Sequence, residues 1–172
     1  MEVNIEVLIS QEEVESRIRE MAEELSIKYA GKQVKLVGIL KGSVFFLSAL
    51  AKYMTIPVTI DFISISSYGN NTESSGVIKF NKDLDDPIEG EDVIIVEDVL
   101  DTGRTLSFVK RVLEDRNPAS LELITLLDKP SRRLAPVSLL MAGFTIPDRF
   151  VVGYGLDYAQ MYRNLPYIGV IE

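Results

Sequence analysis

The fold class is decided by one stretch, Val93-Ile94-Ile95-Val96-Glu97-Asp98-Val99-Leu100-Asp101-Thr102-Gly103-Arg104-Thr105-Leu106. Four apolar residues lead into two adjacent carboxylates, a third carboxylate follows, and a Thr-Gly-Arg-Thr turn opens a helical pattern. Such an apolar run predicts a strand buried in a parallel sheet, and small hydroxyl residues at a helix N-terminus favour phosphate binding. The stretch therefore predicts a binding site at a strand end, with phosphate on the turn and hydroxyl groups or a metal ion on the carboxylates. A phosphorylated sugar fits both halves of this site.

Composition limits the chemistry that the 172 residues can perform. Apolar residues make up 47% and charged residues 26% of the chain, which is typical of one ordinary globular domain, so we expect a single domain over 1–172. Cysteine and histidine are both absent. This excludes a thiolate nucleophile, a zinc–sulfur site and the usual general base. Proton transfer must use a carboxylate, lysine or tyrosine, and a metal cofactor would be an oxygen-bound ion such as Mg²⁺.

The formal net charge of −8 restricts the partners. A nucleic-acid binder needs a basic surface, so no nucleic-acid partner is expected. A polyphosphate substrate has to overcome the same negative field, and a divalent cation bound to it would help. The sequence contains no apolar run of about 18 residues, and its acidic N-terminus lacks a basic segment, so no membrane contact or signal peptide is predicted. The expected location is cytoplasmic.

Apolar spacing predicts alternating strands and helices. Ser10-Gln11-Glu12-Glu13 forms a capping box before apolar residues at helical spacing, so a helix is expected from there to about Gly31. The other expected elements are a strand over 34–40, a helix to about 54, strands over 58–66 and 77–81 that form a hairpin, a helix to about 116, a strand over 121–127, and two or three short strands after 137, one of them over 149–154. Residues 68–76 are expected to form a long loop. This order favours an α/β fold with a twisted parallel sheet and helices on both faces.

Two other nucleotide-binding patterns are excluded. An apolar strand that ends in acidic residues also occurs as a Walker B strand, but that reading requires a G-x-x-x-x-G-K-[ST] loop, which is absent. The dinucleotide pattern G-x-G-x-x-G is absent as well. Adjacent carboxylates such as Glu97 and Asp98 can accept hydrogen bonds from both hydroxyls of a ribose and hold Mg²⁺ nearby. The alternative, that they are solvated loop charges, is weakened by the Thr-Gly-Arg-Thr turn that follows.

The stretch resembles the sequence with which type I phosphoribosyltransferases bind 5-phosphoribosyl 1-diphosphate (PRPP): an apolar strand, two acidic residues and a D-[ST]-G-x-T turn. The resemblance extends over nearly the whole chain and points to the hypoxanthine-guanine branch. It rests also on Leu40-Lys41-Gly42-Ser43, Ser66-Ser67-Tyr68-Gly69, Leu126-Leu127-Asp128-Lys129 and the segment from Arg149 to Tyr158. It implies a mainly parallel sheet flanked by helices, with a small hood formed by the chain termini.

The resemblance implies a set of roles for the PRPP side of the site. Glu97 and Asp98 bind the ribose hydroxyls and Mg²⁺. The 5′-phosphate is assigned to the turn of Thr102, Gly103, Arg104 and Thr105. The diphosphate is assigned to Lys41, Gly42 and Arg163. A cis peptide bond is implied between Leu40 and Lys41. A flexible lid over about 66–78, beginning with Ser67 and Tyr68, is implied to cover the site.

The resemblance also assigns the purine side. Asp101 is the catalytic proton acceptor at purine N7, Lys129 donates to the exocyclic O6, and Phe150 stacks on the base. The backbone of Val151 meets the base edge, and Asp157 lies near that edge and a second Mg²⁺. Because an ammonium group only donates, Lys129 favours 6-oxopurines over adenine.

The implied activity is purine salvage, in which PRPP and hypoxanthine or guanine give IMP or GMP plus diphosphate. Two alternatives remain open, namely an enzyme that prefers xanthine and a non-catalytic PRPP-binding regulator. The resemblance also implies a homodimer or homotetramer. Taken one by one, three of these residues also have a purely structural explanation. Lys41 could belong to a simple turn, Phe150 to the core and Arg163 to a surface ion pair.

Overall fold

A six-stranded sheet forms the centre of the computed structural model, which describes residues 3–67 and 78–172 but not the side chain of Ser67. The strand order is β4-β3-β2-β5-β6-β7, and only β4 runs antiparallel to its neighbour. The strands are β2 (Val34–Ile39), β3 (Val58–Ser67), β4 (Ile78–Lys82), β5 (Asp92–Leu100), β6 (Ser120–Asp128) and β7 (Met141–Thr145). The predicted α/β fold with a mainly parallel sheet is confirmed.

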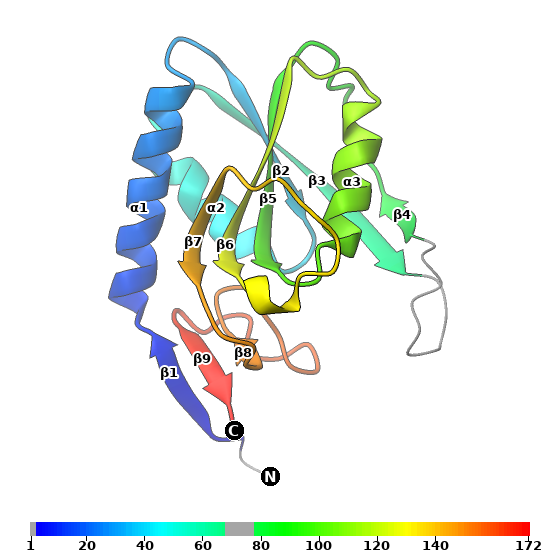
Figure 1. Cartoon of the computed structure of the whole chain (residues 1–172). Coiled ribbons are helices and arrows are strands. Elements are labelled where there is room, and N and C mark those ends of the chain that lie inside the picture. The colour runs from blue at the N-terminus through cyan, green and yellow to red at the C-terminus, as the bar shows by residue number, and fades with distance from the viewer. Residues whose placement is uncertain (1–2, 68–77) are drawn as a thin grey trace.

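Helices cover both faces of this sheet, as predicted (Figure 1). Helices α1 (Gln11–Lys28) and α2 (Val44–Tyr53) pack on one face, and α3 (Arg104–Glu114) packs on the other. Successive residues of β5 point to opposite faces, so Ile94 contacts the α1 and α2 side while Ile95 contacts the α3 side, both with no exposed surface. Burial on both faces explains why the four residues from Val93 to Val96 are all apolar.

The capping box of α1 is confirmed. The Ser10 hydroxyl accepts a hydrogen bond from the backbone amide of Glu13 at 3.2 Å, and the Glu13 carboxylate accepts one from the amide of Ser10 at 3.4 Å. The helix ends at Lys28, slightly before the predicted end at Gly31, because Tyr29 has left the helical conformation. Gly31 follows with a φ of 79° and turns the chain toward β2.

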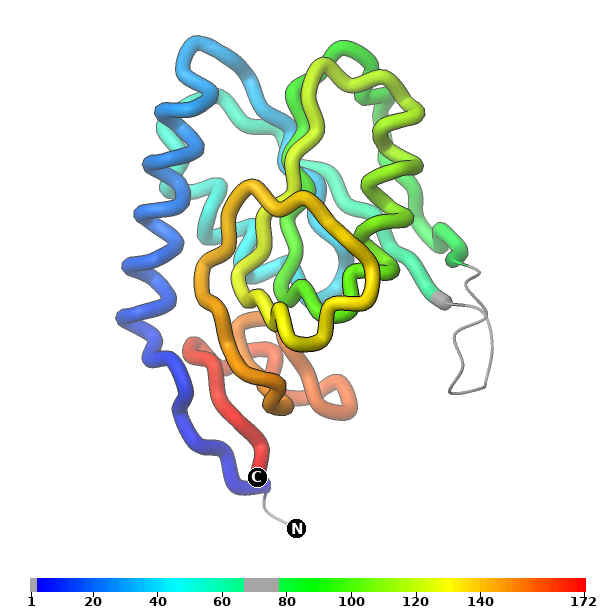
Figure 2. The backbone as a smooth tube through the Cα atoms, in the orientation of Figure 1, coloured from blue at the N-terminus to red at the C-terminus, as the bar shows by residue number. Residues whose placement is uncertain are grey.

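The two chain termini build a second, smaller sheet in the order β1-β9-β8. Its strands are β1 (Ile5–Ile9), β8 (Val151–Val152) and β9 (Ile168–Ile171). Figure 2 shows the first strand, in blue, beside the last strand, in red, and the amide of Glu172 donates to the carbonyl of Asn4 at 3.3 Å. This confirms the predicted hood. The strand expected over 149–154 has only two residues because Gly153 and Tyr154, with φ of 96° and 48°, turn the chain.

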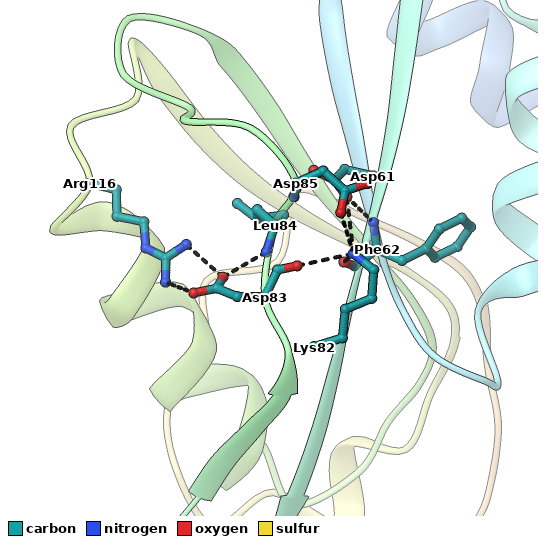
Figure 3. A network of polar contacts seen from close by, with 7 residues as sticks. All are labelled: Asp61, Phe62, Lys82, Asp83, Leu84, Asp85 and Arg116. Carbon is teal, nitrogen blue, oxygen red and sulfur yellow. Dashed lines mark hydrogen bonds and ion pairs between the residues drawn. The ribbon is translucent and has the colours of Figure 1, made fainter.

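The alternating pattern of β3 predicts its strand correctly but not the burial of Asp61, which is 5% exposed, while Ile60 is 50% exposed. Buried carboxylates need partners, and Asp61 has three. It accepts from the amides of Phe62 and Asp85 at 2.7 and 2.9 Å and pairs with the Lys82 ammonium at 3.5 Å (Figure 3). The network holds the end of β4 and the segment after it against β3.

Parallel strands direct their carboxyl ends to one edge of the sheet, and the hood lies beyond that edge (Figure 1). Glu97 and Asp98 lie in the carboxyl-terminal part of β5, and the other described site residues follow β2, β5 or β6 at this edge or belong to the hood segments. Most of the predicted lid, Tyr68 included, falls on 68–77 and lies outside the described residues, and Ser67 is described only by its backbone. Among the helices of the described residues, none has the length and apolarity to span a membrane.

Candidate active site

The carboxylates of Glu97 and Asp98 lie near the carboxyl end of β5. Glu97 accepts a hydrogen bond from the amide of Asp98 at 2.9 Å, and Asp98 Oδ1 accepts from the amide of Val99 at 2.7 Å. Burial, followed by the negative charge of Asp98, raises the pKa of Glu97 well above its ordinary value. Two adjacent carboxylates of this kind repel each other unless a cation lies between or beside them. Their oxygens are the ligand type that Mg²⁺ prefers.

The loop after β2 packs directly on this acidic pair. A Cβ atom at Gly42 would lie 1.9 Å from Asp98 Oδ2, so a side chain there would displace the Asp98 carboxylate. The same loop meets the hood segment at Gly155, whose φ is 100° and where a Cβ would lie 2.0 Å from the Gly42 carbonyl oxygen. The peptide bond between Leu40 and Lys41 is cis, as predicted. Three segments that are distant in the sequence therefore meet at Gly42, which lies against the Asp98 side chain and the Gly155 backbone.

Gln160 joins the two cations that were predicted to bind diphosphate. Its side-chain oxygen accepts from Lys41 Nζ at 3.3 Å and from Arg163 at 3.2 Å. Arg163 also donates to the Gly155 carbonyl at 2.6 Å and pairs with Asp157 at 3.3 Å, while its buried Nε has no partner among the described residues. Two cations with an unpaired buried donor suit a polyanion. The sequence gives no pattern that singles out Gln160.

Asp157 does not join the acidic pair on β5. One of its oxygens pairs with Arg163, and the other accepts from the Gln160 amide at 2.9 Å. Within residues 3–67 and 78–172, no three acidic groups lie together in a way that could hold a metal ion. A metal role for Glu97 and Asp98, and one for Asp157, therefore stay predictions.

The turn after β5 leads into α3, whose N-terminus offers backbone donors to an anion. Gly103, with a φ of 81°, is the residue before the helix, and a Cβ there would lie 2.7 Å from the carbonyl oxygen of Ala135. The carbonyl of Thr102 accepts from the amides of Leu134 and Ala135 at 2.8 and 3.0 Å. The segment after β6 thus holds the turn in place. Arg104 and Thr105 are exposed on the first helical turn.

On the predicted purine side, Lys129 is only 8% exposed and donates from Nζ to the Arg149 carbonyl at 2.8 Å. Phe150 is 53% exposed, which leaves its ring available for stacking. The ring of Tyr158 meets it edge-on, with 5.8 Å between the ring centroids and 86° between the planes. Val151 is buried in β8. The hood therefore carries an exposed aromatic ring next to a buried ammonium group.

Asp101 is held by two consecutive arginines. Its Oδ1 accepts from Arg132 Nε at 2.5 Å, and its backbone carbonyl accepts from Arg133 Nε at 3.1 Å. Arg132 also pairs with Asp148 at 3.3 Å. The sequence prediction named neither arginine, although two adjacent arginines shortly after Lys129 would have been a reason to expect an anionic neighbour.

Comparisons with known proteins agree with this geometry. The profile of the phosphoribosyl transferase domain matches residues 7–159. The chain belongs to the phosphoribosyltransferase family. It is 47% identical over 166 residues to the hypoxanthine-guanine phosphoribosyltransferase of Bacillus subtilis, which covers 96% of this chain and 92% of that protein. These matches confirm the type I family and the hypoxanthine-guanine branch.

Two further matches define the extent of the similarity. A crystal structure of a hypoxanthine phosphoribosyltransferase from Staphylococcus aureus superposes with a TM-score of 0.94 at 48% identity, covering 97% of this chain and 91% of that one. The bifunctional protein TilS/HprT of Listeria innocua is 48% identical over 166 residues, 96% of this chain. The chain spans only 26% of the length of that Listeria protein.

Proposed function

We propose that this phosphoribosyltransferase transfers the phosphoribosyl group of PRPP to hypoxanthine or guanine, which gives IMP or GMP and diphosphate. The proposal rests on one observation above all. The acidic pair of β5, the Thr-Gly-Arg-Thr turn, the Lys41 loop and the buried Lys129 converge on the edge of the sheet that the hood covers. Such convergence offers separate contacts for ribose, 5′-phosphate, diphosphate and a 6-oxopurine.

The chain's own groups suffice for the steps that need a protein side chain. The bond from C1′ to diphosphate breaks with its electron pair on the leaving oxygen, and purine N9 forms the new bond to C1′. Lys41 and Arg163 both donate hydrogen bonds to the Gln160 side chain. Together they would offset the negative charge that develops on diphosphate. The proton on purine N7 passes to the carboxylate of Asp101, which is accessible at 41% exposure.

Lys129 supports the choice of a 6-oxopurine. Its Nζ uses one hydrogen bond on the Arg149 carbonyl and has further donors for the purine O6. Adenine presents an amino group at that position, so its binding would oppose donor to donor in a buried site. Phe150 provides the stacking surface.

We further propose Mg²⁺ as the cofactor, with Glu97 and Asp98 as the residues that hold it and the ribose hydroxyls. Bound to diphosphate, Mg²⁺ would offset the negative charge of the leaving group. A homodimer or homotetramer, expected from the family resemblance, and a cytoplasmic location, expected from the sequence, stay proposals. Size-exclusion chromatography with light scattering measures the first of these.

One experiment separates this function from its alternatives. Transfer is followed by absorbance with PRPP, Mg²⁺ and each of hypoxanthine, guanine, xanthine and adenine. We expect turnover with hypoxanthine or guanine and at least about 100-fold lower kcat/KM with adenine. Faster turnover with xanthine than with either would indicate a xanthine enzyme. PRPP binding without turnover of any base would indicate a regulator. The net charge of −8 already argues against a regulator that binds nucleic acid.

A further inference from the structure

Among the described residues, the Asp101 carboxylate is held on one side only. Arg132 Nε donates to Oδ1 at 2.5 Å, and Arg133 fixes the backbone of the same residue through its carbonyl at 3.1 Å. With the carbonyl and Oδ1 both held, rotation of the side chain is restricted and Oδ2 becomes the oxygen left for another donor. A catalytic base oriented by a third group is a recurrent arrangement in enzymes.

We propose that Arg132 is a positioning residue for the transfer reaction, which binds Oδ1 of Asp101 so that Oδ2 faces N7 of the purine. This inference rests on the proposed function, in which Asp101 accepts the N7 proton. In this role Arg132 would not itself touch the substrate or the reacting atoms. It acts through the orientation of the carboxylate.

The position of Arg132 supports this role because it links the segments that form the purine side of the site. Arg132 ends a short 3₁₀ helix, Pro130–Arg132, that begins directly after Lys129. Its second partner, Asp148, pairs with the guanidinium at 3.3 Å and stands two residues before Phe150. The Arg132 guanidinium therefore fixes the position of Asp101, the proton acceptor, relative to Lys129 and Phe150.

If the ion pairs of Arg132 only stabilised the fold, their loss would lower stability and leave turnover unchanged. Side-chain exposure is 45% for Arg132, 41% for Asp101 and 50% for Asp148. Ion pairs this exposed contribute little to folding stability. Loss of Arg132 should therefore leave the thermal midpoint almost unchanged, and an effect on turnover would come from the position of the carboxylate.

The test compares kcat and KM for Arg132→Ala, Arg132→Lys, Asp101→Asn and the double variant Arg132→Ala with Asp101→Asn, with hypoxanthine and PRPP. We expect Arg132→Ala to lower kcat by about tenfold or more while KM for PRPP and the thermal midpoint hardly change. Arg132→Lys should recover part of kcat. In the Asp101→Asn background, Arg132→Ala should change kcat by less than about twofold, since no proton acceptor remains to be oriented.

Arg19→Ala serves as the control, because this arginine on α1 contacts Tyr53 and lies outside the proposed site. Unchanged or higher kcat in Arg132→Ala, or effects of the two substitutions that multiply, would overturn the proposal while the transfer activity of the wild type stands. If Asp101→Asn keeps the wild-type kcat, the proton-acceptor role itself is wrong and the proposal for Arg132 falls with it. If Arg132→Ala does not fold, Arg132→Lys decides: a kcat below wild type with KM unchanged supports the role, and a wild-type kcat overturns it.

Discussion

At the scale of single residues, Lys129 carries the selectivity that we propose for 6-oxopurines. Its ammonium is buried, and the Arg149 carbonyl holds it at 2.8 Å. Lys129→Ala removes the donor for O6, so kcat/KM for hypoxanthine and guanine should fall by about 100-fold or more. PRPP affinity should change by less than about twofold because we propose that other segments bind PRPP.

Steady-state kinetics with each base and calorimetric titration of PRPP measure the two effects of Lys129→Ala. Lys52→Ala, an exposed lysine in the last turn of α2, is the matched control for loss of one positive charge. Equal losses for base use and for PRPP binding would mean that Lys129 supports the whole site and does not select the base.

Tyr29 contributes to the dependence of stability on alkaline pH. Burial, and then the nearby charges of Glu122 and Asp92, raises its pKa to about 12 in the folded protein, against about 10 in the unfolded chain. The stability tied to this raised pKa is fully present below pH 10 and is lost as pH rises toward 12, since the unfolded phenol releases its proton first. Tyr29→Phe lacks this loss.

Urea unfolding at pH 9 and pH 11 tests the role of Tyr29. We expect the wild type to lose more unfolding free energy than Tyr29→Phe over this interval, while the two differ by about 1 kcal/mol or less at pH 7. Parallel losses in both proteins would show that the Tyr29 phenol does not ionise in this way.

At the scale of elements, the site depends on a close contact between the loop after β2 and the hood segment. A Cβ at Gly155 would lie 2.0 Å from the Gly42 carbonyl oxygen, and the φ of Gly155 is 100°. Gly155→Ala should force the two segments apart, raise KM for PRPP by about tenfold or more and lower the free energy of unfolding by about 1–3 kcal/mol.

Gly31→Ala is the control for Gly155→Ala. Gly31 also has positive φ, 79°, but a Cβ there would meet nothing within 4 Å. This variant should show backbone strain alone, with lower stability and unchanged KM. A KM that rises equally in both variants would mean that the contact between the two segments does not matter for PRPP.

At the scale of the whole molecule, we expect the hood and the main sheet to unfold together. Ile168 of β9 has no exposed surface and belongs to the same buried cluster as residues of α1 and β2. Ile168→Ala should lower the global free energy of unfolding by about 2–5 kcal/mol and retain one cooperative transition. Circular dichroism and tyrosine fluorescence in urea measure this. A separate early transition, with the main one unchanged, would contradict the single domain.

Local chemistry explains what could be predicted from the sequence. The capping box at Ser10, the apolar run of β5 and the turn at Gly103 act within a few residues of the chain, so their patterns are visible directly. The family resemblance, which is itself a property of the sequence, supplied the hood and the cis bond before Lys41. Burial of Asp61 could not be predicted because Lys82 and the amide of Asp85, which stabilise its charge, come from another strand and loop.

By itself, the sequence determined the α/β class, the sheet strands and the acidic, phosphate-binding and lysine segments, since each follows from residues that are neighbours in the chain. Only the tertiary structure decided which of these residues touch. It placed Arg132 on Asp101, joined Lys41 to Arg163 through Gln160, and kept Asp157 away from the acidic pair. These contacts join segments about 30 to 120 positions apart in the chain, and their geometry depends on packing of the whole sheet and hood, which no local pattern encodes.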